Sequence, residues 1–475
     1  MKKQVRKLEE YSRLVPKGGS VVTDAVDVDI SGSESSSSVV PMEISAVPSP
    51  GTKRGGNDGS GDGHHSRSWK YATVIIVGEI VGSGILGLPF AMKNLGWIFG
   101  FLASPIFGAW AMYSGLLLSR ARNRYPRCSS YADLAQVLVG RKFALFTQFG
   151  IALNWIALLP YFLVAASDAM LIVFDAVGFD ICFYQISFVV ALILIVPLQR
   201  RSLHGLTRMT FLSDVSILLA IVLMLGDFAA NRNDSARTTT FPPRVGFLEG
   251  YMGISSFLFA FQGQSMFLEI MSEMRNPGEF TKASTVANVV MVVLYALASC
   301  WTYACLGDDV EDFMPDSVRS PAIRAMVGLL LSYHIMCSYM LTHQPLAMQI
   351  YRIVHEGNDM ERTISTPSRK DWAVVVCCLL IFSYTVANVI PFFVSLQGII
   401  GSALGAPIMF GWPPLFYFLS VGGRLSAFDR AMCGFFFFVL LPFCSIAGTI
   451  AAIDDMAKRW ADGRSGPFGC GGDSG

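Results

Sequence analysis

The sequence predicts an all-α polytopic membrane protein with about 11 transmembrane helices. Of its 475 residues, 53% are hydrophobic and only 15% are charged, and the mean hydropathy of +0.49 exceeds that of soluble globular proteins. The apolar residues form runs of about 20, the length that crosses a bilayer core of about 30 Å. The net charge is only +1, and the basic residues lie between apolar runs rather than on one face, which argues against nucleic acid as a partner.

The chain divides into three parts by composition. Residues 1–68 are rich in Ser, Gly, Asp and Pro, which predicts a disordered cytoplasmic tail. Its first residues, MKKQVRKLEE, are not followed by an apolar core, so no cleavable signal peptide is expected. Residues 69–456 are expected to form the transmembrane domain, and residues 457–475 a short polar C-terminal tail.

Each predicted span is an apolar run with polar residues at both ends. The runs are Lys70–Met92, Leu95–Ser119, Phe143–Val173, Ile181–Leu198, Leu206–Phe228, Gly246–Met271, Ala283–Leu306, Ala322–Ile353, Trp372–Ile390, Phe393–Leu419 and Ala431–Ile453. The third and eighth runs exceed the length required, which predicts tilted helices.

The distribution of Lys and Arg predicts the orientation. Basic residues collect at 120–127 and 352–370, on the same side as the N-terminus, whereas the loop at 308–316 on the other side is acidic. The positive-inside rule therefore predicts a cytoplasmic N-terminus. Lys458 and Arg459 follow the last span on the opposite side and disagree with this rule.

The first span contains a concentration of helix breakers, Gly82, Gly84, Gly87 and Pro89, within VGEIVGSGILGLPF. Each glycine weakens a helix interior, and proline removes an amide donor, so the helix is expected to break here. Inside a bilayer, broken helix is tolerated only where it faces protein or a wet cavity. The alternative is an unbroken, glycine-kinked helix packed closely on a neighbour.

The break predicts a binding site formed by Gly82, Ser83, Gly84 and Ile85. If a second half-helix starts near Ile85, the free amides of Ser83, Gly84 and Ile85 point at one place with the positive end of the helix dipole behind them. The sequence therefore predicts an anion site near the middle of the membrane.

A second interruption is predicted about five spans later, in FLFAFQGQSMFLE. Gly263 lies between Gln262 and Gln264, and amide side chains at membrane depth line a pathway or bridge helices. Interrupted helices at matching positions of two halves indicate a transporter site. We expect Phe261, Gln262, Gly263 and Gln264 to form the second wall of the substrate site; helix-bridging glutamines are the alternative.

Four segments resemble the amino acid/auxin permease family, which includes vacuolar and sodium-coupled neutral amino acid transporters. They are GSGILGLPFAMKNLGW at 82–97, SYADLAQVLVG at 130–140, FAFQGQSMFLEIMSEMRNP at 259–277 and PFFVSLQGIIGSALGAPIMFGWPPLFY at 391–417. The resemblance implies the fold of the bacterial leucine transporter, with inverted five-helix repeats, and secondary active symport of amino acids, with neutral ones favoured.

The chain departs from the family at positions that concern the driving ion. Sodium-coupled relatives carry an Asn where this chain has Gly78, so H⁺ is favoured over Na⁺. The titratable candidates for ion coupling are Glu79 in the first span and His343 in the eighth, with His334 on the same span. The alternatives are a static, hydrogen-bonded brace for Glu79 and a solvated helix end for His343.

Other classes of protein are disfavoured by missing motifs. The spans hold neither HExxH nor GxSxG, so no enzyme is predicted. The ten cysteines are scattered without CxxC pairing, so neither a metal site nor a cofactor is expected. The expected partners are an amino acid substrate and the lipid bilayer of a vacuolar, lysosomal or plasma membrane. The remaining rivals are a sodium-coupled amino acid symporter and an amino acid sensor of the same fold, a transceptor.

Overall fold

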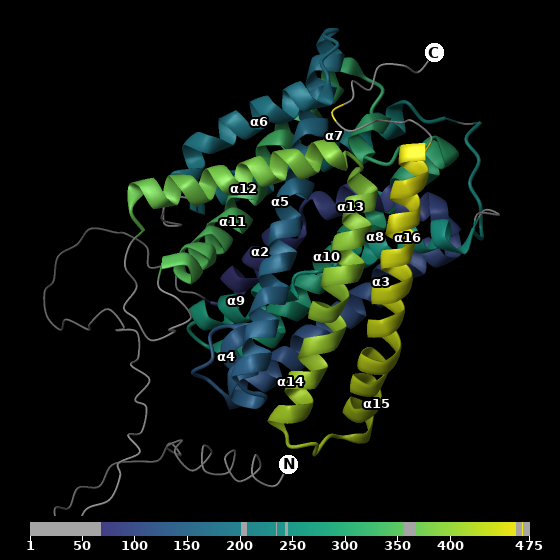
Figure 1. The fold of residues 1–475 in the computed structure, drawn as a ribbon. Helices are drawn as coiled ribbons and strands as arrows, with labels where there is room; N and C mark the ends of the chain where they lie inside the picture. Colours follow the sequence, from purple (N-terminus) through teal and green to yellow (C-terminus); the bar gives the residue numbers. More distant parts are fainter. Residues whose placement is uncertain are drawn as a thin grey trace, which may run out of the picture. The chain divides into compact units, whose positions relative to one another are not determined.

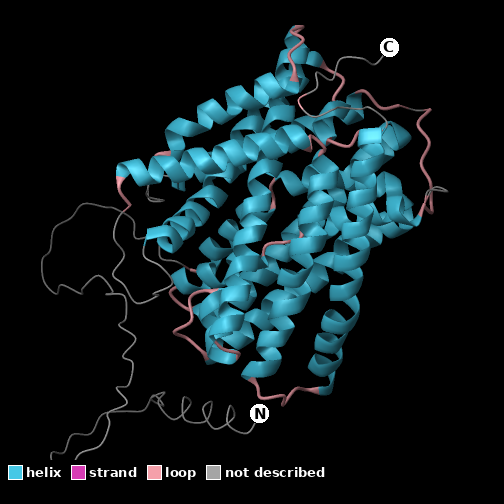
Figure 2. Cartoon of the chain, in the orientation of Figure 1, coloured by secondary structure: helices cyan, strands magenta, loops and turns pink. Residues whose placement is uncertain are grey.

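Helices make up almost all of the structure, a computed structural model that describes residues 68–200, 207–233, 235–242, 246–355, 367–461 and 468. Figure 2 shows helices joined by loops, with no strand among the described residues. These residues all lie in one compact unit, Gly63–Asn358 with Ser365–Gly475. The predicted tail at residues 1–68 lies outside the described residues except for Ser68, whose side chain caps the first helix.

Eight helices among the described residues are long and apolar enough to cross a membrane. They correspond to eight of the predicted spans. The other three predicted spans are shorter helices: the 16-residue α6 (Phe183–Leu198) and the two interrupted spans. The uninterrupted long helices are α5 (Arg141–Val177), α7 (Thr207–Ala230), α10 (Phe280–Leu306), α11 (Pro321–His355) and α12 (Arg369–Val389).

The first span breaks where the glycines predict it. Helix α2 (Trp69–Ile80) ends at Ile80, a 3₁₀ turn covers Ser83–Gly87, and α3 (Leu88–Arg124) follows. Pro89 stands in the first turn of α3, where a missing amide donor costs nothing. Helix α3 itself turns at Gly96, whose φ of 71° suits glycine. It therefore contains the end of the first predicted span and the whole second one.

The second interruption also lies at its predicted place. Helix α8 (Phe247–Ala260) ends at Ala260, a 3₁₀ turn covers Gln264–Met266, and α9 (Phe267–Glu273) continues the span. The intervening Gly263 has φ −140° and ψ 0°, which is not helical. The first and sixth predicted spans are thus both broken after a half-helix.

The last two spans contain π-helical segments. Helices α13 (Phe393–Ile399) and α14 (Trp412–Ser420) are joined by π-turns at Ile400–Gly405 and Pro407–Gly411. Helices α15 (Ala427–Phe435) and α16 (Leu441–Ala461) are joined by another at Phe436–Leu440. Such segments are frequent at functional sites. Helix α16 extends to Ala461, beyond the predicted start of the C-terminal tail.

The two breaks lie side by side inside the bundle. Helix α8 contacts the 3₁₀ turn of the first break, and α10 packs along both α2 and α3. Elsewhere in the bundle, α5 packs extensively against α11 (Figure 1). This packing leaves the broken backbone surrounded by protein, as a membrane interior requires.

Two ends of the bundle can be distinguished by their loops. We call the end that carries the 231–242 and 307–320 loops the acidic end; Asn233 N donates to Cys305 O there at 3.1 Å. Arg324 pairs with Asp175, near the C-terminal end of α5, at 2.9 Å, so that end of α5 also lies at the acidic end. At the opposite, basic end lies α4 (Tyr131–Leu138), a short helix that was not predicted; a capping box of Ser130 and Asp133 begins it.

Candidate substrate site at the two helix breaks

The first break exposes two unpaired amides. Three were predicted, at Ser83, Gly84 and Ile85, but the amide of Ile85 donates to the carbonyl of Gly82 at 3.4 Å. Among the described residues, no acceptor takes the amides of Ser83 or Gly84. Both residues are buried. The break therefore offers two neighbouring backbone donors to an anionic group.

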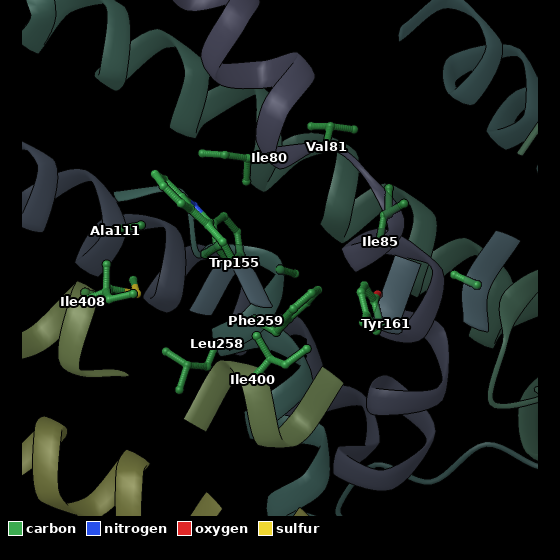
Figure 3. Packing of buried hydrophobic residues seen from close by; sticks show 14 of the residues in the cluster. Ile80, Val81, Ile85, Ala111, Trp155, Tyr161, Leu258, Phe259, Ile400 and Ile408 are labelled. Carbon is green, nitrogen blue, oxygen red and sulfur yellow. The ribbon is translucent and has the colours of Figure 1, made fainter. Parts of the chain in front are cut away.

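Tyr161 on α5 brings a third donor to the same place. Its side chain is fully buried; the Ser83 side chain interacts with its hydroxyl, which makes no hydrogen bond of normal geometry within the described part of the chain. The ring stacks on Phe393 at 5.0 Å and meets Phe259 edge-on at 4.9 Å. Figure 3 shows Phe259 between Tyr161 and Trp155, with Ile85 beside Tyr161. A buried hydroxyl without a partner is uncommon and requires an explanation.

The glycines of the breaks allow close approach of the two half-helices. A Cβ added at Gly84 would lie 3.1 Å from Cα of Ala260, and one added at Gly263 would overlap the side chain of Ile80. A side chain at Gly84 would press on the backbone of Ala260, and one at Gly263 would displace the side chain of Ile80. The glycines thus serve packing as well as the exposure of backbone amides.

Several break carbonyls already have donors from distant helices. The hydroxyl of Tyr295 on α10 lies 2.9 Å from the carbonyl of Ile80 and 3.0 Å from that of Ala260. Gln397 Nε2 donates to Gly84 O at 3.2 Å, and the Tyr131 hydroxyl donates to Gln264 O at 2.8 Å. Sequence reasoning missed these three donors, although Tyr131 and Gln397 lie inside the family-like segments.

The predicted second wall is only partly turned toward the first break. Gln262 donates to Asn154 Oδ1 on α5 at 2.7 Å, while Gln262 Oε1 and Asn154 Nδ2 are buried without a partner among the described residues. Gln264 Oε1 accepts from the amide of Gly263 at 3.1 Å. The ring of Phe261 is fully buried and meets Tyr295 at 5.0 Å.

Phe259, not Phe261, is the aromatic side chain next to the unpaired amides. A Cβ at Gly84 would lie 3.6 Å from Phe259 Cδ1, whereas a Cβ at Gly108 on α3 would lie 3.3 Å from Phe261 Cε1. Phe261 therefore packs on the α3 and α10 side. The signal that could have selected Phe259 is its spacing of two residues before Phe261, which places it on another face of α8.

Glu79 lies in the last turn of α2 and keeps its side chain exposed. The charged group that acts on it is Asp214 of α7. Gly78 makes room for this neighbour, because a Cβ there would lie 2.6 Å from Asp214 Oδ2. Neither carboxylate forms an ion pair or hydrogen bond within the described residues. Two carboxylates at membrane depth without a basic partner are rare and mark a candidate place for ion coupling.

The two histidines of α11 lie in different surroundings. His334 Nδ1 is 2.8 Å from Ser213 Oγ, and its Nε2, which has no described partner, lies 3.6 Å from the position of a Cβ on Gly82. His343 is fully buried and stacks on Tyr339 with centroids 6.0 Å apart. It is therefore not a solvated helix end. Nine residues of helix separate it from His334 by about 14 Å.

No group of three or more His, Cys, Asp or Glu side chains that could hold a metal ion occurs among the described residues. The polar groups at the breaks are amides, carbonyls and hydroxyls. The amide and hydroxyl donors suit an anionic group and the carbonyl acceptors suit a cationic one, so together they match a zwitterionic organic ligand.

Comparisons with known proteins address the fold and the family. The fold of this chain is similar to that of MhsT, as seen in a solved structure of MhsT in complex with L-phenylalanine. The TM-score is 0.53 and the sequence identity is 13%, and the match covers 81% of this chain and 96% of the MhsT chain. MhsT has the bacterial leucine transporter fold, so the predicted fold class is confirmed.

Sequence relatives and a family model identify the group. The N amino acid transport system protein of Neurospora crassa is 23% identical over 86% of this chain and 90% of its own length. The amino acid transporters ANT1 and AVT1D of Arabidopsis thaliana are 25% and 24% identical over 78% and 81% of this chain and 91% and 69% of their own. These relatives are transporters, not enzymes. The family model described as transmembrane amino acid transporter protein matches residues 65–454, and the chain belongs to that family.

Proposed function

We propose that the chain carries amino acids across a membrane by secondary active transport and binds its substrate between the two helix breaks. The observation that carries the proposal is the convergence of three unpaired buried donors, the amides of Ser83 and Gly84 and the hydroxyl of Tyr161. An unpaired buried donor costs about 1–3 kcal/mol, which a ligand acceptor removes. The α-carboxylate of an amino acid supplies that acceptor.

The ammonium group of the substrate then requires acceptors on the other side. Tyr295 already occupies the carbonyls of Ile80 and Ala260. The carbonyls of Val81 and Phe261 receive no donor among the described residues, so they are our candidates for the ammonium. Phe261 therefore contributes through its main chain.

Neutral side chains suit the surroundings of this site. The aromatic rings beside the unpaired amides, Tyr161 and Phe259, are uncharged, and so is the Gln262–Asn154 pair. A charged substrate side chain would lose its hydration here without gaining a partner of opposite charge. We therefore propose neutral amino acids as the substrate class.

The driving ion in this proposal is the proton, and Glu79 carries it. Glu79 lies in the last turn of α2, just before the first break, where a wet cavity at the break would bring water to it. Asp214 is its charged neighbour, so a proton bound by Glu79 removes a repulsion between two like charges. His343 lies too far along α11 to take part in the same group, so we assign the coupling to Glu79.

We propose that the acidic end faces the outside or a lumen and that the N-terminus is cytoplasmic. The positive-inside rule supports this orientation. Cys182, in the loop before α6 at the acidic end, is disulfide-bonded, and disulfides persist in oxidising compartments. The exception at Lys458 and Arg459 has a local reason, because Lys458 pairs with Glu249 at 2.9 Å and Arg459 pairs with Asp312 and Asp455.

Substrate analogues test this proposal more cleanly than a change at Gly84. A Gly84→Val side chain would push against Ala260 and disturb packing as well as binding. Uptake of a labelled neutral amino acid into liposomes containing the purified protein should be inhibited by other neutral amino acids but not by the corresponding amines, which lack the carboxylate. Equal inhibition by the amines would contradict carboxylate docking. Binding without uptake would indicate a sensor in place of a transporter.

A further inference from the structure

One buried hydroxyl connects the two helix breaks. Tyr295 is fully buried in the middle of α10, and its hydroxyl oxygen lies 2.9 Å from the carbonyl oxygen of Ile80 and 3.0 Å from that of Ala260. Ile80 is the last residue of α2, and Ala260 is the last residue of α8. The two acceptors thus hold equivalent positions, each at the end of the half-helix before a break.

The geometry limits the distance between the breaks. Because both carbonyl oxygens lie about 3 Å from the same oxygen atom, they are at most about 6 Å apart. A phenol has one proton, so at any moment it makes one full hydrogen bond or shares it between the two carbonyls. Losing this donor would leave the carbonyl of Ala260 without a partner among the described residues, whereas that of Ile80 would keep its bond from the amide of Gly82 at 2.8 Å.

Other donors to the breaks each serve only one of them. Gln397 reaches Gly84 in the first break, and Tyr131 reaches Gln264 in the second. Within the part of the chain that the structure describes, Tyr295 is the side chain that hydrogen-bonds to both. Its ring is held independently by an edge-on contact with Phe261 at 5.0 Å, so the hydroxyl can be removed without removing the ring.

We propose that Tyr295 is a positioning residue that sets the spacing of the two breaks and thereby the fit of the substrate between them. This inference rests on the proposed function, in which the amides of Ser83 and Gly84 bind one end of an amino acid and the carbonyls of Val81 and Phe261 bind the other. A fixed spacing of the breaks keeps both sets of groups at the separation of a carboxylate and an ammonium on one carbon. Pre-organisation of this kind lowers the cost of binding.

The test compares Tyr295→Phe with Tyr303→Phe. Tyr303 is a matched control because it is fully buried on the same helix and its hydroxyl accepts a hydrogen bond from Thr239 N at 2.8 Å, away from both breaks. Hydrogen–deuterium exchange of the purified, substrate-free protein should become at least about tenfold faster in Tyr295→Phe in both segments, 77–90 and 257–270. The Kd for a labelled neutral amino acid should rise at least about tenfold. Tyr303→Phe should leave both quantities within about twofold of wild type.

The two readouts separate this inference from the proposed function. If wild type binds no amino acid, the proposed function fails, while the exchange data still decide whether Tyr295 connects the breaks. Faster exchange in one segment only, or exchange equal to that of Tyr303→Phe, overturns the inference. An unchanged Kd with faster exchange in both segments overturns the positioning role.

A second variant covers the case in which Tyr295→Phe does not fold. Incorporation of 3-fluorotyrosine at position 295 keeps the ring and makes the hydroxyl a stronger donor. Exchange in both segments should then be slower than in wild type. Unchanged exchange would overturn the inference.

Discussion

Replacing Tyr161 with Phe should weaken substrate binding without weakening the fold. The hydroxyl makes no hydrogen bond of normal geometry among the described residues, so its removal costs the fold only its interaction with the Ser83 side chain. The ring keeps its contacts with Phe393 and Phe259. A hydrogen bond to a charged group contributes about 1.5–3 kcal/mol. At about 1.4 kcal/mol per tenfold change, the Kd for a neutral amino acid should rise by about 10- to 150-fold.

The assay measures substrate Kd and the melting temperature of the substrate-free protein in detergent. Tyr303→Phe again serves as the control, because its hydroxyl is hydrogen-bonded and its loss should cost stability but not affinity. We expect the opposite pattern for Tyr161→Phe: weaker binding and a melting temperature close to that of wild type. An unchanged Kd, or a loss of stability equal to that of the control, would refute the assignment of Tyr161 to the substrate carboxylate.

Three further predictions follow from other residues. Glu79→Gln, which mimics the protonated acid, should retain substrate exchange across liposome membranes and lose accumulation driven by a pH gradient; accumulation in this variant would show that Glu79 is not the carrier. Phe259→Ala should change which neutral amino acids compete for uptake, since one methylene that fits a pocket or fails to fit it changes the binding free energy by about 1–3 kcal/mol. Phe261→Ala should chiefly lower stability. An unchanged competition profile in Phe259→Ala would contradict its place in the pocket. Although its side chain is exposed, surrounding protein desolvates Asp316 in the acidic-end loop and raises its pKa to about 7, an effect that neighbouring carboxylates increase and Arg324 opposes. A carboxyl group whose pKa rises on folding contributes stability that is fully present below its unfolded pKa near 3.8 and is lost as the pH rises toward 7. The melting temperature of the wild type should therefore fall between pH 4 and pH 8, and that of Asp316→Asn should fall less. An equal decline in both proteins would contradict this.

The helix breaks could be predicted because their causes are local. Gly82, Gly84 and Pro89 disfavour helix by their own covalent structure, and Gly263 does so in the second break. The spans could be predicted for a similar reason, since length and hydropathy are properties of contiguous residues. The end of the last helix was less predictable, because Arg459 continues α16 while paired with Asp312, 147 positions earlier in the chain.

The contacts that complete the site depend on residues far apart in sequence. Tyr295 is separated from Ile80 by 215 positions and stands in an apolar span, where it resembles any buried aromatic residue. The fold brings the carboxylate of Asp214, in the fifth predicted span, against Gly78 in the first, a contact that neither span predicts by itself. The spacing of Phe259 and Phe261 places them on different faces of α8, but only the packing of that helix shows which face meets the first break.

Uptake into liposomes shows directly whether a proton gradient drives amino acids through the site between the two breaks. Purified protein in liposomes should accumulate a labelled neutral amino acid above equilibrium when an inward proton gradient is imposed without sodium. An inward sodium gradient at equal pH on both sides should not drive accumulation. Accumulation under the sodium gradient alone, or under neither gradient, would contradict the account.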